Sequence, residues 1–350
     1  MDLALLERTL NELREPSYRA RQVLGWTLRG APSFAEMTNL PSRLRAELTA
    51  RVPFSTLAVQ RCSQARDGTI KVLFCTRDGR PVEAVLMRFG DGRQSVCISS
   101  QSGCPLTCTF CATGQMRFGR NLTASEIIDQ VLHFKRLAGG PDHAVFMGMG
   151  EPLLNLDAVL EASQHLPELG IAHRRVAIST VGWVPGIKRL AAEPMPLRLA
   201  LSLHAAEDPL RSELMPVNER YPVAEVLAAC RDYWSRKRRR VFVEYVMLAD
   251  VNDSYPQAVA LASVLDPRIF KVNLIPYNPT ASPYRGSSRK AIDAFRGELQ
   301  RRGLMVTVRV ERGREIDAAC GQLAAAAPQK TYGAVSGLAR SASHSGSSSG

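Results

Sequence analysis

The chain beyond residue 112 alternates between strand-like and helix-like segments, and this alternation restricts the possible fold more than any other feature. Runs such as HAVFMGMG, RRVAIST, LRLALSLH and FKVNLIPYN are rich in β-forming residues, and amphipathic stretches such as TASEIIDQVLHFKRLA and VAEVLAACRDYWSRK separate them. Repeated βα units place their strands in a parallel sheet. Counting SVCISS as the first strand gives six βα repeats, with MVTVRV as a further strand. The sequence therefore predicts an α/β fold with an incomplete (β/α)6 barrel.

Three further segments differ from the barrel, which is expected to span residues 96–325. Residues 1–55 have helical patterns with interleaved arginines. They predict a small N-terminal helical accessory domain that either contacts RNA or only packs with a solvated basic face. Residues 56–95 hold short alternating runs between Asp-Gly turns and predict a β-rich connecting segment. Residues 326–350 form a Ser/Gly-rich tail that is expected to be disordered.

The bulk composition is that of a globular protein, with 45% hydrophobic and 22% charged residues among 350. No apolar run reaches the length of a membrane span, and the first residues lack a secretory signal pattern, so we expect a cytoplasmic protein with no membrane partner. The net charge of +12 favours a polyanionic partner such as nucleic acid, although liberal use of arginine gives the same excess.

The stretch GCPLTCTFCATG carries the most specific chemical signal. It places Cys104, Cys108 and Cys111 in a C-x3-C-x2-C spacing. Three thiolates from one loop can hold three irons of a [4Fe–4S] cluster and leave the fourth iron open to a substrate or cofactor. The alternative is a structural zinc site, which normally has four ligands in two pairs. No fourth ligand follows at such a spacing, and His133 falls inside a helical pattern, so the spacing favours the cluster.

With Phe110 inside the second gap and a βα barrel behind it, this loop is similar to that of the radical S-adenosylmethionine (SAM) enzymes. In that superfamily the open iron binds the amino and carboxylate groups of SAM, and reduction yields a 5′-deoxyadenosyl radical. Polar residues and glycines that end the following strands are candidate SAM contacts. For His204 the alternative is ordinary capping of a strand end.

Six runs in fixed order resemble one family within that superfamily: CISSQSGCPLTCTFCATG, FMGMGEPLLN, ALSLHA, VEYVML, NLIPYNP and IDAACGQLA. They are similar to the dual-specificity RNA methyltransferases of the RlmN/Cfr group, from about residue 15 to 325. The resemblance implies methylation of C2 of adenosine 2503 in 23S rRNA and of adenosine 37 in tRNAs. The alternatives are C8 methylation of the same rRNA adenosine, the antibiotic-resistance type, and a metal-stabilised RNA-binding protein without catalysis.

The resemblance also implies a mechanism that uses two SAM molecules per turnover. Cys320 would take a methyl group from the first and become S-methylcysteine, and a radical made from the second would activate that methyl for addition to adenine. Glu83 would be the proton acceptor. Cys97 would be the resolving thiol that forms a transient disulfide with Cys320 and releases the product. Cys62, Cys75 and Cys230 have no motif around them and are expected to be small hydrophobic residues.

The remaining expectations concern ligands and partners. The resemblance implies SAM contacts at Gly150, Glu151, Ser179, Ser202, Leu203, His204 and Asn278. The expected partners are 23S rRNA, tRNA and an electron donor such as flavodoxin, and the protein is expected to be a monomer. The basic run from Arg236 to Arg240 either contacts RNA or is a solvated helix end.

Overall fold

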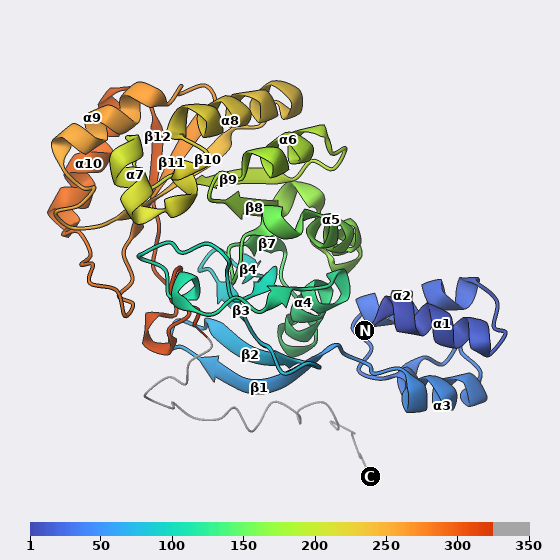
Figure 1. Ribbon diagram of the computed structural model, residues 1–350. Coiled ribbons are helices and arrows are strands. Elements are labelled where there is room, and N and C mark those ends of the chain that lie inside the picture. The colour runs from blue at the N-terminus through green and yellow to red at the C-terminus, as the bar shows by residue number, and fades with distance from the viewer. Residues whose placement is uncertain (325–350) are drawn as a thin grey trace, which may run out of the picture.

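The computed structural model describes residues 1–324, and the tail expected at residues 326–350 lies outside this part of the chain. Ten strands form one sheet in the order β1-β2-β3-β4-β7-β8-β9-β10-β11-β12 (Figure 1). Their bounds are β1 (Leu57–Gln64), β2 (Ile70–Thr76), β3 (Pro81–Arg88), β4 (Gln94–Cys97), β7 (His143–Phe146), β8 (Val176–Thr180), β9 (Arg198–Ser202), β10 (Val241–Met247), β11 (Phe270–Pro276) and β12 (Met305–Val308). The short strands β5 (Gln101–Ser102) and β6 (Arg120–Asn121) pair separately.

The six predicted barrel strands are β4 and β7 to β11, and each pairs in parallel with the next. β12 adds a further parallel strand beside β11, as MVTVRV predicted. The sheet curves around an interior, but its edge strands β1 and β12 do not pair with each other in the described part of the chain. The prediction of an incomplete (β/α)6 barrel is therefore confirmed.

Helices cover the outer face of this barrel. Residues 1–324 hold ten α-helices, of which the first three form the N-terminal unit: α1 (Leu3–Glu12), α2 (Tyr18–Leu28), α3 (Ser42–Arg51), α4 (Ala124–Ala138), α5 (Leu156–His165), α6 (Val184–Ala192), α7 (Asp208–Leu214), α8 (Val223–Lys237), α9 (Tyr255–Val264) and α10 (Arg289–Arg301). α4 begins at a capping box in which Thr123 Oγ1 accepts from the Glu126 backbone N–H and Glu126 Oε2 accepts from the Thr123 N–H. This box starts the first barrel helix soon after the cysteine loop.

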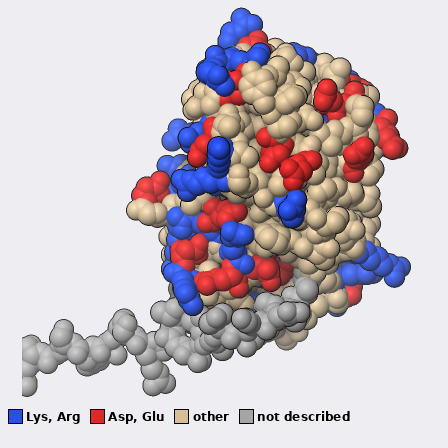
Figure 2. Space-filling view, turned by 90° about the vertical axis from the view of Figure 1, so that its left-hand side faces the viewer, with Lys and Arg blue, Asp and Glu red and all other residues tan. Residues whose placement is uncertain are grey.

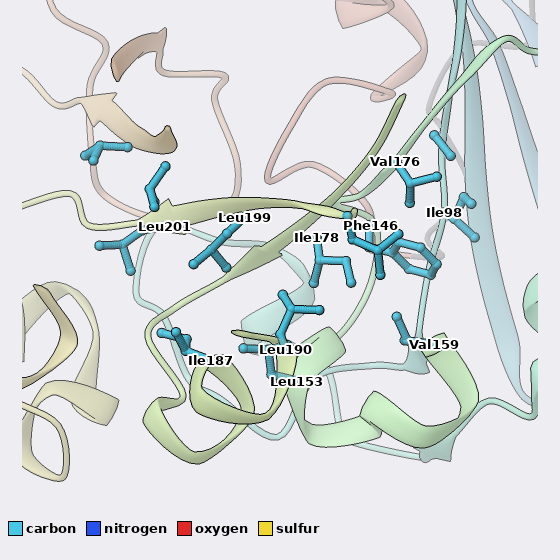
Figure 3. Close-up of a cluster of buried hydrophobic side chains, with 14 of the residues drawn as sticks. Ile98, Phe146, Leu153, Val159, Val176, Ile178, Ile187, Leu190, Leu199 and Leu201 are labelled. Atoms are coloured by element: carbon cyan, nitrogen blue, oxygen red, sulfur yellow. The ribbon is translucent and has the colours of Figure 1, made fainter. Parts of the chain in front are cut away.

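Alternation along the strands separates the core from the interior of the barrel. Ile178, Leu199 and Leu201 point outward and are fully buried against Ile187 and Leu190 of α6 (Figure 3). Successive side chains of a strand face opposite ways, so the residues between them face inward. Each buried leucine or isoleucine contributes about 1.5–3 kcal/mol to folding. The apolar outer layer thus holds the barrel together and leaves the inner positions available for a site.

The connecting segment continues the barrel sheet. β1, β2 and β3 pair antiparallel in sequence order, and β3 pairs antiparallel with β4 so that Val85 lies opposite Cys97. Residues 56–95 therefore extend the sheet at its β4 edge. Within residues 1–324, none of the helices combines the length and apolar character that crossing a bilayer needs.

The three N-terminal helices enclose their own apolar cluster and lie beside α4 and α5 (Figure 1). Asp129 of α4 fastens the segment that follows them, because its Oδ2 accepts from both the backbone N–H and the hydroxyl of Thr56 at 2.6 Å. α2 also packs against the short 3-10 turn Leu166–Leu169 that precedes β8. The N-terminal helices are thus held at the end of the barrel where its parallel strands begin.

We expect Asp129→Ala to lower the free energy of unfolding by about 3 kcal/mol, because it leaves the buried Thr56 donors without an acceptor. Asp157→Ala is the matched control, since Asp157 is 85% exposed and its one ion pair within residues 1–324 is with Arg189. This variant should change stability by less than about 0.5 kcal/mol. Urea denaturation of both variants measures the difference. Equal effects of the two substitutions would contradict this role for Asp129.

Candidate active site

One cavity at the carboxyl ends of the parallel strands gathers most of the predicted site residues. Its lining includes Cys111, Gly150, Glu151, Ser179, Ser202, His204, Asn278 and Cys320. These residues come from six different segments, yet parallel strands bring their carboxyl ends to one edge of the sheet. Leu203 is the exception among the predicted SAM contacts. Its side chain is fully buried, and its backbone N–H donates to the carbonyl of Glu244.

The three cysteines of the C-x3-C-x2-C motif lie in the loop that follows β4 and β5. Gly114 allows this loop to fold tightly, since a side chain there would lie 2.9 Å from the carbonyl oxygen of Cys108. Burial raises the pKa of Cys104 to about 12 and raises that of Cys108 well above its usual value, and the neighbouring thiols add to both shifts. Such thiols need a cationic partner to become thiolates, as metal ligands must.

The chemistry of the donors fits an iron–sulfur cluster. In a [4Fe–4S] cluster each thiolate binds a different iron, so the sulfur atoms stand further apart than around zinc. An all-sulfur donor set on one loop, with its cysteines close enough to raise one another's pKa, suits that arrangement.

Gly150 and Glu151 form a turn that packs tightly on β5. Gly150 has a φ of +95°, and a side chain on it would lie 2.5 Å from Gln101. Gln101 Oε1 accepts from the Glu151 N–H at 2.8 Å, while the Glu151 carboxylate accepts from the backbone N–H groups of Leu153 at 3.0 Å and Val181 at 2.9 Å. Burial raises the pKa of Glu151 to about 7. A buried carboxyl at the cavity wall is suited to accept from a cationic ligand.

Polar side chains from the next two strands complete this wall. The hydroxyl oxygens of Ser179 and Ser202 lie 3.3 Å apart at the ends of β8 and β9. His204 follows with a φ of 60°, and its Nδ1 accepts from the Val246 N–H at 3.0 Å. Burial lowers the pKa of His204 to about 3, which keeps the ring neutral and able to accept. His204 thus caps β10 while its ring also lines the cavity.

Cys320 lies on the opposite wall, in a turn tied to the rest of the site. Its carbonyl oxygen accepts from Asn278 Nδ2 at 3.4 Å, and the carbonyl of Gly321 accepts from the Ala112 N–H in the cysteine loop at 2.8 Å. Cys320 and Cys97 together line a second, smaller hollow, and both are free thiols. Burial raises the pKa of Cys97 to about 12, and the nearby Cys320 adds to the shift. The structure therefore brings together two cysteines that lie far apart in the chain.

Glu83 lies deeper than the other predicted residues and lines neither of these two spaces. Its side chain is 1% exposed and forms an ion pair of 3.1 Å with Lys71, whose ammonium group also donates to the carbonyl of Asp317. Because Val85 lies opposite Cys97, strand alternation puts Glu83 on the same face of the sheet as Cys97. A buried ion pair thus links β2 and β3 to the segment that carries Cys320.

Two residues of the site were missed from the sequence. Arg309 lines both spaces, and the nearness of Cys320 raises its pKa despite its burial. Glu244 also lines the main cavity, and its Oε2 accepts from Asn273 Nδ2 at 2.7 Å. Burial raises the pKa of Glu244. A charged residue in the middle of the apolar strand VFVEYVM was the available signal for Glu244, because such a residue is rarely buried without a partner or a role.

The basic run from Arg236 to Arg240 lies away from this cavity. It directly precedes β10, at the end of the barrel opposite to the strand carboxyl ends. Arg236 pairs with Asp232 at 3.1 Å, and Arg238 stacks over the Trp234 ring. Part of the run is thus held by its own helix, as expected for a solvated helix end.

An open parallel barrel with a three-cysteine loop and a polar cavity at its strand carboxyl ends defines the chain as a radical SAM enzyme. Residues 98–262 match the model of the Radical SAM superfamily, and residues 1–53 match that of the ribosomal RNA large subunit methyltransferase N-terminal domain. The superfamily implies a 4Fe–4S cluster and SAM as cofactors.

Relatives with high sequence identity over most of the chain show which family of this superfamily it belongs to. The probable dual-specificity RNA methyltransferase RlmN of Heliobacterium modesticaldum is 47% identical over 89% of this chain and 85% of its own. The dual-specificity RNA methyltransferase RlmN of Syntrophobacter fumaroxidans is 45% identical over 91% and 95%. The crystal structure of a radical SAM methyltransferase from Sphaerobacter thermophilus has a TM-score of 0.88 at 46% identity and covers 93% of this chain and 98% of its own. The chain belongs to the RlmN family of dual-specificity RNA methyltransferases.

Proposed function

We propose that this protein methylates C2 of adenosine 2503 in 23S rRNA and C2 of adenosine 37 in tRNAs through an S-methylcysteine. The observation that carries the proposal is the position of Cys320 and Cys97, which line one hollow beside the candidate SAM cavity. A ring carbon of adenine is a poor nucleophile, so direct attack on the methyl group of SAM is unavailable to it. A thiol that first accepts the methyl group, with a second thiol to release the product, meets this need.

The residues of the site have distinct proposed roles. Cys104, Cys108 and Cys111 hold the cluster, while Glu151 and the serines that end β8 and β9 hold SAM. When bound, the cluster supplies the electron that cleaves SAM. Cys320 accepts a methyl group and presents it to adenine, and Cys97 then takes Cys320 into a disulfide. For Glu83 as the proton acceptor, the support is its position on the same sheet face as Cys97.

RNA analysis after an in vitro reaction tests the proposal. The anaerobically reconstituted protein is incubated with SAM, a chemical reductant and either a 23S rRNA fragment or tRNA, and the digested RNA is examined by mass spectrometry. We expect 2-methyladenosine in both RNAs, together with about one 5′-deoxyadenosine and one S-adenosylhomocysteine per methyl group, because one SAM is cleaved and the other donates. Formation of 8-methyladenosine would assign the other carbon, and unmodified RNA would refute the function.

The carboxyl of Glu151 predicts a pH dependence of SAM binding. A group with a pKa of about 7 is mostly neutral at pH 6 and mostly ionised at pH 8, and the ionised form is the stronger acceptor for the N–H groups of the SAM amino group. We therefore expect the affinity of the cluster-loaded protein for SAM to rise about tenfold from pH 6 to pH 8. Equilibrium dialysis measures it, and Glu151→Gln should abolish the rise. A flat profile for the unsubstituted protein would contradict the role of Glu151.

A further inference from the structure

The interior of the barrel continues past the candidate active site to the opposite end of the strands. The inward-facing residues of β7, β8 and β9 include Val145, Ala177 and Ala200, whose side chains are small and line a hollow in the interior. They line another cavity, which lies where the parallel strands begin. This cavity shares Met147, Glu244 and Arg309 with the candidate active site. Only a thin layer of side chains therefore lies between the two spaces.

The cavity at the strand beginnings is strongly basic. Its lining includes Arg93, His143, Arg175, Arg198, Arg309 and Arg312, whereas Glu244 is its one acidic residue in the described part of the chain. These side chains come from separate strands and turns. They are therefore brought together by the curvature of the sheet, and no run of charges in the sequence predicts this cavity. We call this cavity, with its lining, the basic mouth.

The charges of the basic mouth are only partly compensated by carboxylates. Within residues 1–324, Arg198 has no carboxylate within salt-bridge distance, and burial together with the nearby Arg239 lowers its pKa. Arg175 reaches only the half-exposed Asp142, at 3.7 Å. Exposed ion pairs of that length contribute little free energy. Arg93 and Arg312 pair with Asp91 and Asp67 only at 3.8 and 4.0 Å, and His143 shares Asp142 with Arg175. The cavity therefore keeps an excess of positive charge, which favours an anionic ligand.

An aromatic ring at the rim adds a second kind of contact. Arg93 and Arg312 both stack on Phe89, at 4.2 and 4.8 Å from the ring centroid. Interleaved arginine and aromatic side chains are typical of surfaces that bind single-stranded nucleic acid, where phosphates meet the cations and bases stack on flat groups. The N-terminal helices lie at the same end of the barrel, because α2 packs against the turn Leu166–Leu169 just before β8.

We propose that the substrate RNA enters the barrel through the basic mouth, with the backbone of a single-stranded loop held by Arg93, Arg175 and Arg198. The target adenine then passes inward toward Arg309 and the two thiols, while SAM occupies the cavity at the opposite end. This inference rests on the proposed function and adds the route of the RNA to it. Separate entrances let two bulky reactants meet at Cys320 without competing for one opening.

An RNA-binding experiment with a matched control tests the route. The double variant Arg175→Ala/Arg198→Ala is compared with Arg289→Ala/Arg296→Ala, which removes the same charge from the outer helix α10. Arg289 is 96% exposed, and both control arginines pair with Asp293. On the face that carries α10, basic and acidic side chains are interleaved, so it offers no field of one sign (Figure 2). The probe is a labelled RNA stem-loop with one target adenine, and anisotropy gives its Kd over a range of salt concentrations.

We expect the basic-mouth variant to bind the stem-loop at least tenfold more weakly. The slope of log affinity against log salt concentration should fall by about 1.4, because each lost contact to single-stranded phosphate removes about 0.7. The α10 variant should keep the Kd and slope of the unsubstituted protein, and both variants should bind SAM normally. Unchanged RNA binding by the basic-mouth variant, while the unsubstituted protein still methylates the stem-loop, would overturn the route but leave the proposed function standing.

Two further measurements make the test complete. Ala177→Phe narrows the interior behind the rim, so RNA should bind with its usual Kd while methylation falls at least 100-fold and cleavage of SAM continues. Methylation at the full rate in this variant would overturn passage through the barrel. A basic-mouth variant that is impaired only with an acidic flavoprotein as reductant, and not with a chemical one, would instead assign this surface to a redox partner.

Discussion

Cys320→Ala is expected to abolish RNA methylation while leaving iron content and SAM binding unchanged. The thiol is the proposed methyl acceptor, and alanine offers no nucleophile, so the rate should fall more than about 1,000-fold. The fold should survive, because Cys320 lies half-buried in a turn and its hydrogen bond with Asn278 uses the backbone carbonyl. Methyl transfer to RNA is measured with SAM labelled in its methyl group.

Two other cysteine variants make this result specific. Cys230→Ala is the matched control, since Cys230 is fully buried in α8 away from the cavity and should keep full activity. Cys97→Ala should fail one step later, because methylated Cys320 still reacts but no second thiol releases the product. RNA should then stay covalently attached to the protein on a denaturing gel. Full methylation by Cys320→Ala would refute the two-thiol mechanism.

Cys108→Ala is expected to prevent assembly of the iron–sulfur cluster and to abolish activity with it. A [4Fe–4S] cluster held by three thiolates loses a third of its protein ligands, and Cys108 is the most deeply buried of the three. After anaerobic reconstitution, iron should fall from about four per chain to near zero, and the broad absorbance near about 400 nm should disappear. Iron and sulfide analysis with absorbance spectroscopy measures this loss without reference to activity.

The control for this variant is Cys62→Ala. Cys62 lies half-buried on β1, where it packs against the main core. Its replacement should leave iron content unchanged. A Cys108→Ala protein that still holds four irons would exclude Cys108 as a ligand, and zinc in place of iron in the unsubstituted protein would exclude the cluster.

Local sequence patterns were sufficient to predict the order of the helices and strands. Strand and helix periodicity and the capping box at Thr123 depend on residues a few positions apart, so all six barrel strands and β12 could be predicted. The motif spacing likewise placed three cysteines on one loop. Parallel strands share one carboxyl edge, which is why residues as distant as Glu151 and Asn278 could be assigned to the same cavity.

Membership of a sequence motif did not predict which side chains face the cavity. Leu203 sits between Ser202 and His204 in sequence, yet it points into the core because the chain alternates at the end of β9. Glu83 shows a related limit. No local sequence pattern predicts that Lys71, twelve positions earlier, forms a buried ion pair with it.

The sequence by itself determined the order and type of the elements, the cysteine triad and the family, because each depends on short-range spacing. Only the tertiary structure decided which side chains share a space. The curvature of the sheet sets Cys97 beside Cys320 and Arg309 between the candidate active site and the basic mouth, and it gathers Arg93, Arg175 and Arg198 into that mouth. These contacts join residues on different strands, and their distances are set by the register and curvature of the sheet, which no single segment encodes.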